Sequence, residues 1–247
     1  MVEPVRLNNI EAFRNALAQY QISLRAQRVL DESRLVVLSG LAGGGRNTTI
    51  NYLVEHANYM FLVSDTTRPP KLRGGVMEQH GVHYYFRTEQ DMLHDIQNGN
   101  FIEAEIIHNQ QVSGTSIREL EKANKAGLIG IHDFEFGGAR NIAEAKPDAN
   151  IIGLLPPSYD EWLRRLQARE EMHDVEFKNR LETAEKVLEQ MLGESYFTFV
   201  VNDTVERCAE AIRAIVESGK ADPERQAASR QVAQELLVQV IQHLKSL

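Results

Sequence analysis

The sequence predicts an α/β protein with a mostly parallel sheet built around a phosphate-binding loop. Short, continuously apolar runs, typical of strands covered on both faces, alternate with segments of helical periodicity. A glycine-rich turn follows the first of these runs and precedes a helical segment. The 247 residues suffice for one large domain or two small ones with a substantial core.

The predicted elements follow from hydrophobic spacing. Ile10, Phe13, Leu17 and Tyr20 recur at helical spacing, so we expect one amphipathic helix over about residues 8–29. The apolar runs predict strands at residues 34–39, 59–63, 128–131, 151–155 and 197–201, and the segments between them predict helices at 47–57, 158–169, 176–191 and 204–218.

Residues 64–117 break this alternation. Residues 82–86 and 101–107 have the composition of short strands joined by turns, which indicates an inserted, partly antiparallel subdomain. A breaker-rich linker at 219–223 precedes a C-terminal amphipathic helix whose apolar face packs on its own domain or on a second subunit. We therefore expect an N-terminal helical extension at 1–33, a central domain at 34–218, and the linker and C-terminal helix at 219–247.

Composition restricts the functional classes. Hydrophobic residues make up 43% of the chain and charged residues 25%, which is typical of a folded soluble protein. The first residues lack an apolar signal core and no run is long enough to span a membrane, so we expect a cytoplasmic protein. The single Cys208 fits a reducing compartment, and a net charge of −8 argues against a general nucleic-acid binder.

The glycine-rich turn runs from Gly40 through Gly43, Gly44 and Gly45 into a helix. Its backbone N–H groups and the positive end of the helix favour a bound phosphate. The length matches the P-loop pattern G-x-x-x-x-G-K-[ST], but Arg46 replaces the lysine and Asn47 the hydroxyl residue.

Two other interpretations of this turn remain open. The glycines also fit the dinucleotide turn of short-chain dehydrogenases, although no Tyr-x-x-x-Lys pair for proton transfer occurs in the chain. A glycine-rich turn can also serve only to pack a helix tightly against a strand. The histidines do not favour another chemistry: His80, His83 and His132 lack nucleophile or cysteine partners and are expected to be ordinary surface or core residues.

Downstream motifs carry more information than the turn. Ser64-Asp65-Thr66-Thr67-Arg68-Pro69-Pro70 is followed in order by Glu78-Gln79-His80-Gly81-Val82-His83-Tyr84-Tyr85-Phe86, Phe101-Ile102-Glu103-Ala104, Gly114-Thr115-Ser116 and Asp133-Phe134-Glu135. In order and spacing these segments resemble guanylate kinases, and the resemblance covers about residues 34–217. It implies a P-loop-type core, a monophosphate-binding insert at 64–117 and a helical lid at about 160–185.

The resemblance implies an acceptor site for GMP or dGMP. Ser64, Arg68 and Tyr84 would hold its phosphate, with Lys71 as a second cation and Glu78 as the glutamate of the family's G-E pattern. Glu103 would accept hydrogen bonds from guanine N1–H and the exocyclic amine. The remaining acceptor residues would be Thr115 at the guanine carbonyl and Asp133 and Glu135 on the wall near base and metal.

For the donor, the resemblance implies that the turn binds ATP as its magnesium complex. The residues concerned would be Gly40, Gly43, Gly44, Gly45, Arg46, Asn47 and Thr48, with Asn202 near adenine and Asn47 as the candidate magnesium ligand. Arg46 and the lid arginines Arg165, Arg169 and Arg180 would neutralise charge on the transferring phosphoryl group. Outside such a family, arginines on amphipathic helices are usually solvated charges.

Several departures concern the donor side more than the acceptor side. Besides Arg46 and Asn47, Ser113 stands where the family has a phosphate-contacting tyrosine, Gly137 replaces a glutamine, and four extra residues precede Glu78. The leading function is ATP-dependent phosphorylation of GMP or dGMP. The alternatives are a binding module for a nucleotide or phosphorylated partner, and an enzyme redesigned for another donor or a smaller metal requirement. The terminal helices could also form a homo-oligomer.

Overall fold

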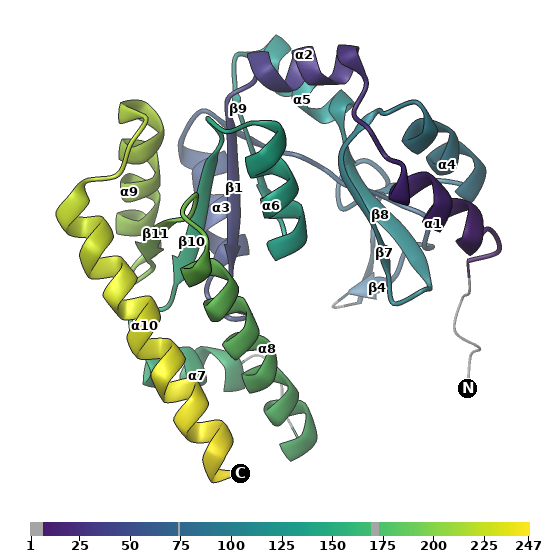
Figure 1. Cartoon of the computed structure of the whole chain (residues 1–247). Helices are drawn as coiled ribbons and strands as arrows, with labels where there is room; N and C mark the ends of the chain where they lie inside the picture. Colours follow the sequence, from purple (N-terminus) through teal and green to yellow (C-terminus); the bar gives the residue numbers. More distant parts are fainter. Residues whose placement is uncertain (1–6, 74, 169–172) are drawn as a thin grey trace. The chain divides into compact units, whose positions relative to one another are not determined.

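The computed structural model describes residues 7–73, 75–168 and 173–247 of the chain. The described chain divides into two compact units (Figure 1). Of the described residues, the first unit contains those within 7–34, 60–130 and 144–147, and the second contains those within 35–59, 131–143 and 148–247. Each unit has its own sheet and core and is described separately.

The second unit is built on the predicted parallel strands. A five-stranded sheet has the order β11–β10–β1–β9–β2, and β1 pairs in parallel with β10, which pairs in parallel with β11. The strands are β1 (Leu35–Gly40), β2 (Tyr59–Phe61), β9 (Ile129–Asp133), β10 (Asn150–Leu155) and β11 (Thr198–Val201). All six residues of β1 are buried, as expected of a strand covered on both faces. The chain passes between the units within β2 and β9.

Helices connect these strands. Those of the second unit are α3 (Arg46–His56), α6 (Phe136–Ala145, which ends in the first unit), α7 (Tyr159–Gln167), α8 (Asp174–Gly193), α9 (Val205–Ser218) and α10 (Pro223–Ser246). Helices α3 and α9 pack against each other, and α10 packs along α8. Among the described residues, no helix is long and apolar enough to cross a membrane.

The first unit contains a four-stranded sheet of order β6–β3–β8–β7. These strands are β3 (Asp65–Thr66), β6 (Tyr85–Phe86), β7 (Phe101–Ile107) and β8 (Gln111–Ser116), and β4 (Leu72–Arg73) with β5 (Val76–Met77) forms a separate hairpin. Strand β8 is antiparallel to β7 and β3, whereas β3 is parallel to β6, which gives the partly antiparallel sheet that the sequence predicts. Helices α4 (Glu89–Gln97) and α5 (Ile117–Ala126) complete the unit together with two N-terminal helices.

The single N-terminal helix predicted over residues 8–29 is wrong. The segment forms α1 (Ile10–Ala18) and α2 (Leu24–Glu32), and residues between the two helices bond to the rest of the first unit. The Tyr20 hydroxyl donates to the carbonyl oxygen of Phe101 and accepts the Phe101 N–H at 2.9 Å. The Ser23 N–H donates to Gly99 at 3.0 Å, and the Ser23 side chain caps α2. Phe13 of α1 is fully buried in a core with Met92, Ile96 and Phe101.

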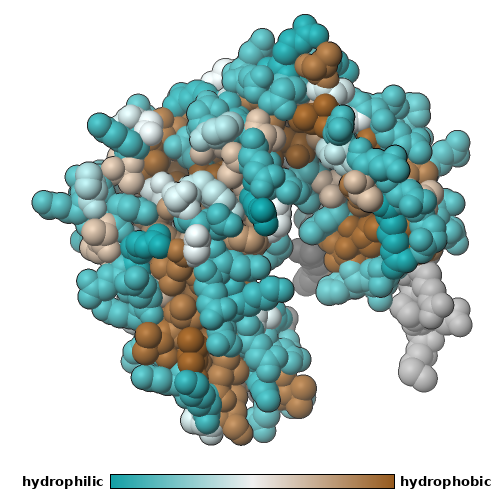
Figure 2. All heavy atoms as spheres, in the orientation of Figure 1, coloured by the Kyte–Doolittle hydropathy of each residue, from teal (hydrophilic) through white to brown (hydrophobic). Residues whose placement is uncertain are grey.

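The C-terminal helix α10 packs on its own unit. Ala233, Leu236 and Val240 are buried, and apolar residues gather along α10 and α8 at the lower left of Figure 2. The Gln226 side chain bonds to β11, accepting the Phe199 N–H at 2.9 Å and donating to Phe197 O at 3.2 Å. Because β11 is an edge strand, this side chain occupies backbone groups that another strand would otherwise pair with.

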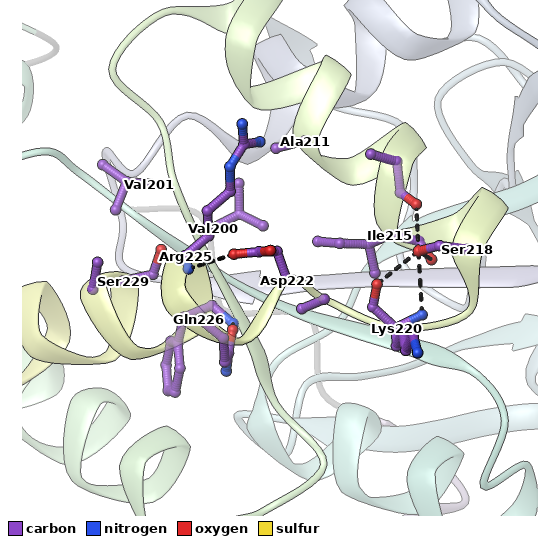
Figure 3. Close-up of a pocket in the computed structure, with 14 residues that line it drawn as sticks. Val200, Val201, Ala211, Ile215, Ser218, Lys220, Asp222, Arg225, Gln226 and Ser229 are labelled. Atoms are coloured by element: carbon purple, nitrogen blue, oxygen red, sulfur yellow. Dashed lines mark hydrogen bonds between the residues drawn. The ribbon is translucent and has the colours of Figure 1, made fainter.

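Between α9 and the first turns of α10 lies a cavity of about 420 Å³ beside β11. Figure 3 shows Val200, Val201 and Ala211 around it, and Asp222 at the start of α10. The Asp222 carboxylate accepts the Arg225 N–H at 2.9 Å, so it caps the helix. Small side chains of both helices line it, among them Ala211, Ala214, Ala228 and Ser229.

Candidate functional site

The candidate donor site lies in the second unit, where β1 meets α3. Gly40, Gly43 and Gly45 all have positive φ, at 151°, 80° and 97°. A Cβ added at Gly40 would lie 2.3 Å from Leu154 O, and one at Gly45 would lie 2.1 Å from Asn202 Nδ2. The turn therefore requires glycine at both positions and leads into the N-terminus of an 11-residue helix, as a phosphate-binding turn should.

Neighbouring elements hold this turn in place. Asn202 donates from Nδ2 to Gly44 O at 3.0 Å, and Trp162 of α7 donates from Nε1 to Ala42 O at 2.8 Å. Arg165, on the same helix, donates to Asn202 O at 3.1 Å and to Glu161 at 2.7 Å. Hydrogen bonds from Arg164 and Arg165 lower the pKa of Glu161 to about 2, so the carboxylate stays charged.

A cavity of about 370 Å³ opens beside the turn. Arg165 and Asn202 line it together with Gly43, Gly45 and Thr48, so the structure brings five sequence-predicted donor residues to one site. The volume falls in the range of small-molecule sites. Arg164 and Asp203 also line the cavity, although the sequence prediction does not include them.

The two substituted P-loop positions occupy the first turn of α3. Arg46 is largely buried, and its Nη1 lies 3.5 Å from Glu135 Oε1. Asn47 and Thr48 are exposed, whereas Thr49 is fully buried and its hydroxyl lies 3.8 Å from Cys208 Sγ. Asn47 and Thr48 thus present oxygen atoms to solvent at the helix N-terminus, and Thr49 does not.

Most of the predicted acceptor residues gather on the sheet of the first unit. The register of β7 and β8 places Glu103 opposite Thr115, and the Thr115 hydroxyl lies 3.2 Å from the Ser64 hydroxyl. Thr115 is fully buried and Glu103 is 8% exposed. A carboxylate and two hydroxyls therefore face one small region, which suits the edge of a hydrogen-bonding base.

A second group in the first unit is centred on Arg68. Its guanidinium makes a two-pronged ion pair with Glu78, at 2.5 and 3.0 Å, and lies 4.7 Å from the centre of the Tyr84 ring. Glu78 also accepts the Lys71 N–H at 2.9 Å, while the Lys71 side chain is exposed. The hydrogen bonds to Glu78 raise the pKa of Arg68, which keeps it charged and able to bind a phosphate.

Burial governs the protonation of Glu103. Desolvation, with a smaller contribution from the nearby Glu105, raises the pKa of its carboxyl group from 4.5 to about 8. The free protein therefore holds much of this group protonated near neutral pH. A ligand that donates hydrogen bonds to the carboxylate would favour its ionised form.

Some predicted residues lie outside these two groups. Asp133 and Glu135 belong to the second unit, whereas the other acceptor candidates belong to the first. Arg180 is exposed on α8 and bonds to Glu176 at 3.3 Å. Arg169 lies outside the described residues. Their predicted roles remain predictions.

Sequence reasoning missed an ion-pair network beneath the acceptor residues. Asp65 is fully buried and accepts hydrogen bonds from Arg87 at 2.5 Å and from Arg118 at 2.6 Å. Arg118 lies 4.0 Å from the centre of the Tyr85 ring. Desolvation raises the pKa of Asp65 despite both arginines. Because the partners are 22 and 53 residues away in sequence, local spacing gives no signal for this network.

The parallel sheet and the glycine turn at the end of β1 define a P-loop-type nucleotide-binding protein. Within that class, the guanylate kinase family model matches residues 32–219. The chain belongs to the guanylate kinase family, whose members are phosphotransferases.

Individual relatives agree with this assignment. A guanylate kinase from Chlorobium luteolum is 35% identical over 189 residues, which cover 76% of this chain and 92% of that protein. Guanylate kinase 1 from Arabidopsis thaliana is 33% identical over 184 residues, 73% of this chain, and the match spans about half of that longer protein, 46%.

A solved structure confirms the fold. The crystal structure of guanylate kinase from Anaplasma phagocytophilum matches with a TM-score of 0.55 and 25% sequence identity, covering 82% of this chain and 94% of the other. Helix α10, at residues 223–246, lies beyond the segment that the family model matches.

Proposed function

We propose that this protein transfers the γ-phosphoryl group of ATP to GMP or dGMP. The observation that carries the proposal is the acceptor group of the first unit, where Glu103 and Thr115 face each other beside Ser64. By their motifs, these residues would take the guanine- and phosphate-binding roles of the family to which the chain belongs. A charged Arg68 stacked on Tyr84 adds a phosphate-binding cation.

In this proposal the donor phosphates bind the turn between β1 and α3. Its N–H groups and the α3 N-terminus would hold them, and Arg46 would supply the positive charge that a P-loop lysine usually gives. Arg165 lines the donor cavity and would neutralise charge on the transferring group. Phosphoryl transfer needs positioning and charge neutralisation more than a protein base, so no histidine is required.

Magnesium enters the proposal as part of the substrate MgATP. The described residues contain no group of three or more His, Cys, Asp or Glu side chains that could hold a metal by themselves. Asn47 and Thr48 offer neutral oxygens beside the turn, which fits an ion held mainly by ATP phosphates and water. When bound, the ion would neutralise charge on the donor phosphates.

A coupled assay of ADP release tests the proposal. With MgATP, we expect turnover with GMP and dGMP and much less with AMP, CMP or UMP, because Glu103 accepts hydrogen bonds that only guanine donates in this arrangement. The Arg68→Ala variant should lose nearly all GMP-dependent turnover. ADP release that does not depend on the added monophosphate would contradict the proposal.

A second candidate function rests on the ion pair between Arg46 and Glu135. If this pair persists with ATP bound, the donor site lacks its main cation and the chain would bind a nucleotide or phosphorylated partner without turnover. Glu135→Gln tests the pair, because it releases Arg46 while Ser64, Glu103 and Thr115 stay unchanged. Glu135 is itself predicted near base and metal, so a fall in activity would point to that role. A gain in kcat would show that the pair restrains a working donor site.

The redesigned-donor alternative predicts different behaviour. Turnover should then be supported by another nucleoside triphosphate, or should depend little on Mg²⁺. A magnesium titration of the wild-type protein tests this alternative. The same titration of Asn47→Ser, which restores the usual hydroxyl ligand, tests whether residue 47 lies near the ion. If Asn47→Ser lowers the magnesium concentration needed for half-maximal rate, Asn47 lies near the ion. Equal titrations would remove it as a metal ligand.

A further inference from the structure

The last turns of α10 contact both helices of the predicted lid region. The hydroxyl of Tyr159, at the start of α7, lies 2.6 Å from His243 Nδ1. The ring of Phe177, in the first turn of α8, meets the His243 ring edge-on with centroids 5.4 Å apart. One side chain of the C-terminal helix therefore joins the beginnings of two helices that are neighbours in sequence.

The Tyr159 hydroxyl and His243 Nδ1 lie close enough to share one hydrogen bond. Tyr159 is 8% exposed, and burial raises the pKa of its phenol to about 12, so the hydroxyl keeps its proton at neutral pH. Where Nδ1 of His243 carries no proton, it can accept a hydrogen bond from this hydroxyl. Tyr159 also lies against Trp162 of the same helix, with ring centroids 5.7 Å apart.

Helix α7 in turn holds the donor loop. Trp162 donates to Ala42 O in the glycine turn, and Arg165 donates to Asn202 O beside the donor cavity. A chain of contacts thus runs from His243 through Tyr159 and α7 to the loop that would bind ATP. All of these residues belong to the second unit.

We propose that His243 of α10 is a positioning residue for the donor site, orienting α7 through Tyr159 and the start of α8 through Phe177. His243 lies outside residues 32–219, so this support comes from a part of the chain that the family model does not match. The kinetic test of this inference rests on the proposed function. A measurement of ATP binding tests the inference without requiring turnover.

Three substitutions at His243 separate its two contacts. His243→Ala removes both, His243→Phe keeps a ring near Phe177 without the acceptor, and His243→Asn places an acceptor near the position of Nδ1. Tyr159→Phe removes the hydroxyl from the other side. Gln242→Ala, at an exposed neighbouring position on α10, is the matched control.

We expect His243→Ala and Tyr159→Phe to lower kcat/KM for ATP about fivefold each, as loss of one hydrogen bond predicts, with KM for GMP unchanged. The double variant should lose less than the product of the two effects, because both remove one interaction. His243→Asn should recover more activity than His243→Phe, and Gln242→Ala should match wild type.

Two results would overturn the proposal: variants that lower the melting temperature but keep the wild-type kinetic constants for ATP, or an equal change in KM for GMP. If wild type shows no turnover, the proposed function fails and calorimetric ATP binding becomes the test. A fivefold weaker Kd in His243→Ala then supports the positioning role, and an unchanged Kd rejects it.

Discussion

At the residue scale, the two units contain different kinds of charged site. Arg68 is buried with Glu78 against an aromatic ring, so its geometry is fixed before a ligand arrives. Arg46 is largely buried too, but its Glu135 partner is 69% exposed and the 3.5 Å separation is loose. Exposed partners contribute little to stability, so Arg46 can exchange Glu135 for a phosphate at small cost.

Arg68 provides the first residue-scale prediction. Arg68→Lys keeps the charge but not the two-pronged geometry, so KM for GMP should rise about tenfold, and Arg68→Ala should raise it about a hundredfold. The exposed Lys71 provides the matched comparison, since Lys71→Ala should change KM severalfold at most. Steady-state kinetics with GMP as the varied substrate measures all three, and a larger effect at Lys71 than at Arg68 would reject this assignment.

Glu103 gives a prediction about pH. Guanine binding favours the ionised carboxylate, which becomes populated in the free protein as the pH rises through the carboxyl pKa of about 8. KM for GMP should therefore fall between pH 6.5 and 8.5 by roughly twentyfold, in step with the ionised fraction of the carboxyl group. Glu103→Gln cannot ionise and should show a flat profile over this range. A wild-type profile as flat as that of the variant would mean that Glu103 does not contact the base.

Glu103 also makes the stability of the fold depend on pH. Stability falls as the pH rises, whereas GMP binding becomes tighter. Because the pKa of Glu103 is higher in the folded state than in the unfolded state, the folded state binds the proton more tightly, and this contribution is lost as the pH rises from about 4.5 to about 8. Glu103→Gln should therefore gain melting temperature relative to wild type as the pH rises over that window. Thermal melts at pH 5 and pH 8 measure the difference, and an equal gap at both values would contradict the raised pKa.

At the element scale, the sequence predicts the parallel strands and most of their connecting helices. Short apolar runs such as Leu35–Leu38 in β1 are typical of strands buried on both faces. The sequence does not predict α4, α5 and α6. Helix α4 buries only Met92 and Ile96, and α6 begins with Phe136-Gly137-Gly138, which is poor in helix formers. Tertiary contacts stabilise α4 and α6 more than local pattern does. Helix α5 does carry local signals, with Ser116 as its N-cap and Gly127 as its C-cap.

The glycine turn is the element on which donor binding depends most. Gly45→Ala places a methyl group against Asn202 in a backbone conformation that favours glycine, so it should destabilise the protein by about 1–3 kcal/mol and weaken ATP binding. Gly127→Ala is the control: its φ is 67°, but a Cβ there meets nothing within 4 Å. Chemical denaturation and calorimetry with ATP compare the two. Equal ATP affinity in both variants would show that the turn does not bind the nucleotide.

At the scale of the whole molecule, the sequence predicts the acceptor and donor residues but not their division between units. Sequence motifs identify Ser64, Glu103 and Thr115 as candidate acceptor residues. The structure adds that the register of β7 and β8 places Glu103 opposite Thr115, next to Ser64. Long-range pairs carry no such signal. The Asp65 network and the anchoring of α7 by Trp162 depend on contacts that only the folded chain makes.

The terminal helices give a prediction about assembly. Their main apolar side chains, Phe13 in α1 and Leu236 and Val240 in α10, are buried within their own units. We therefore expect a monomer of 28.0 kDa rather than a dimer formed through these helices. Light scattering coupled to size exclusion measures the mass directly, and a stable mass near twice that value would show that another surface associates.

The central claim is that the donor site of the second unit and the acceptor residues of the first unit serve one phosphoryl transfer. Analysis of the products tests this claim most directly. Purified full-length protein incubated with MgATP and GMP should form GDP and ADP in equal amounts, as resolved by phosphorus NMR or ion-exchange chromatography. At a GMP concentration below the wild-type KM, Arg68→Ala should form both about a hundredfold more slowly. GMP binding by calorimetry without any GDP would contradict the claim and would establish a nucleotide-binding module instead.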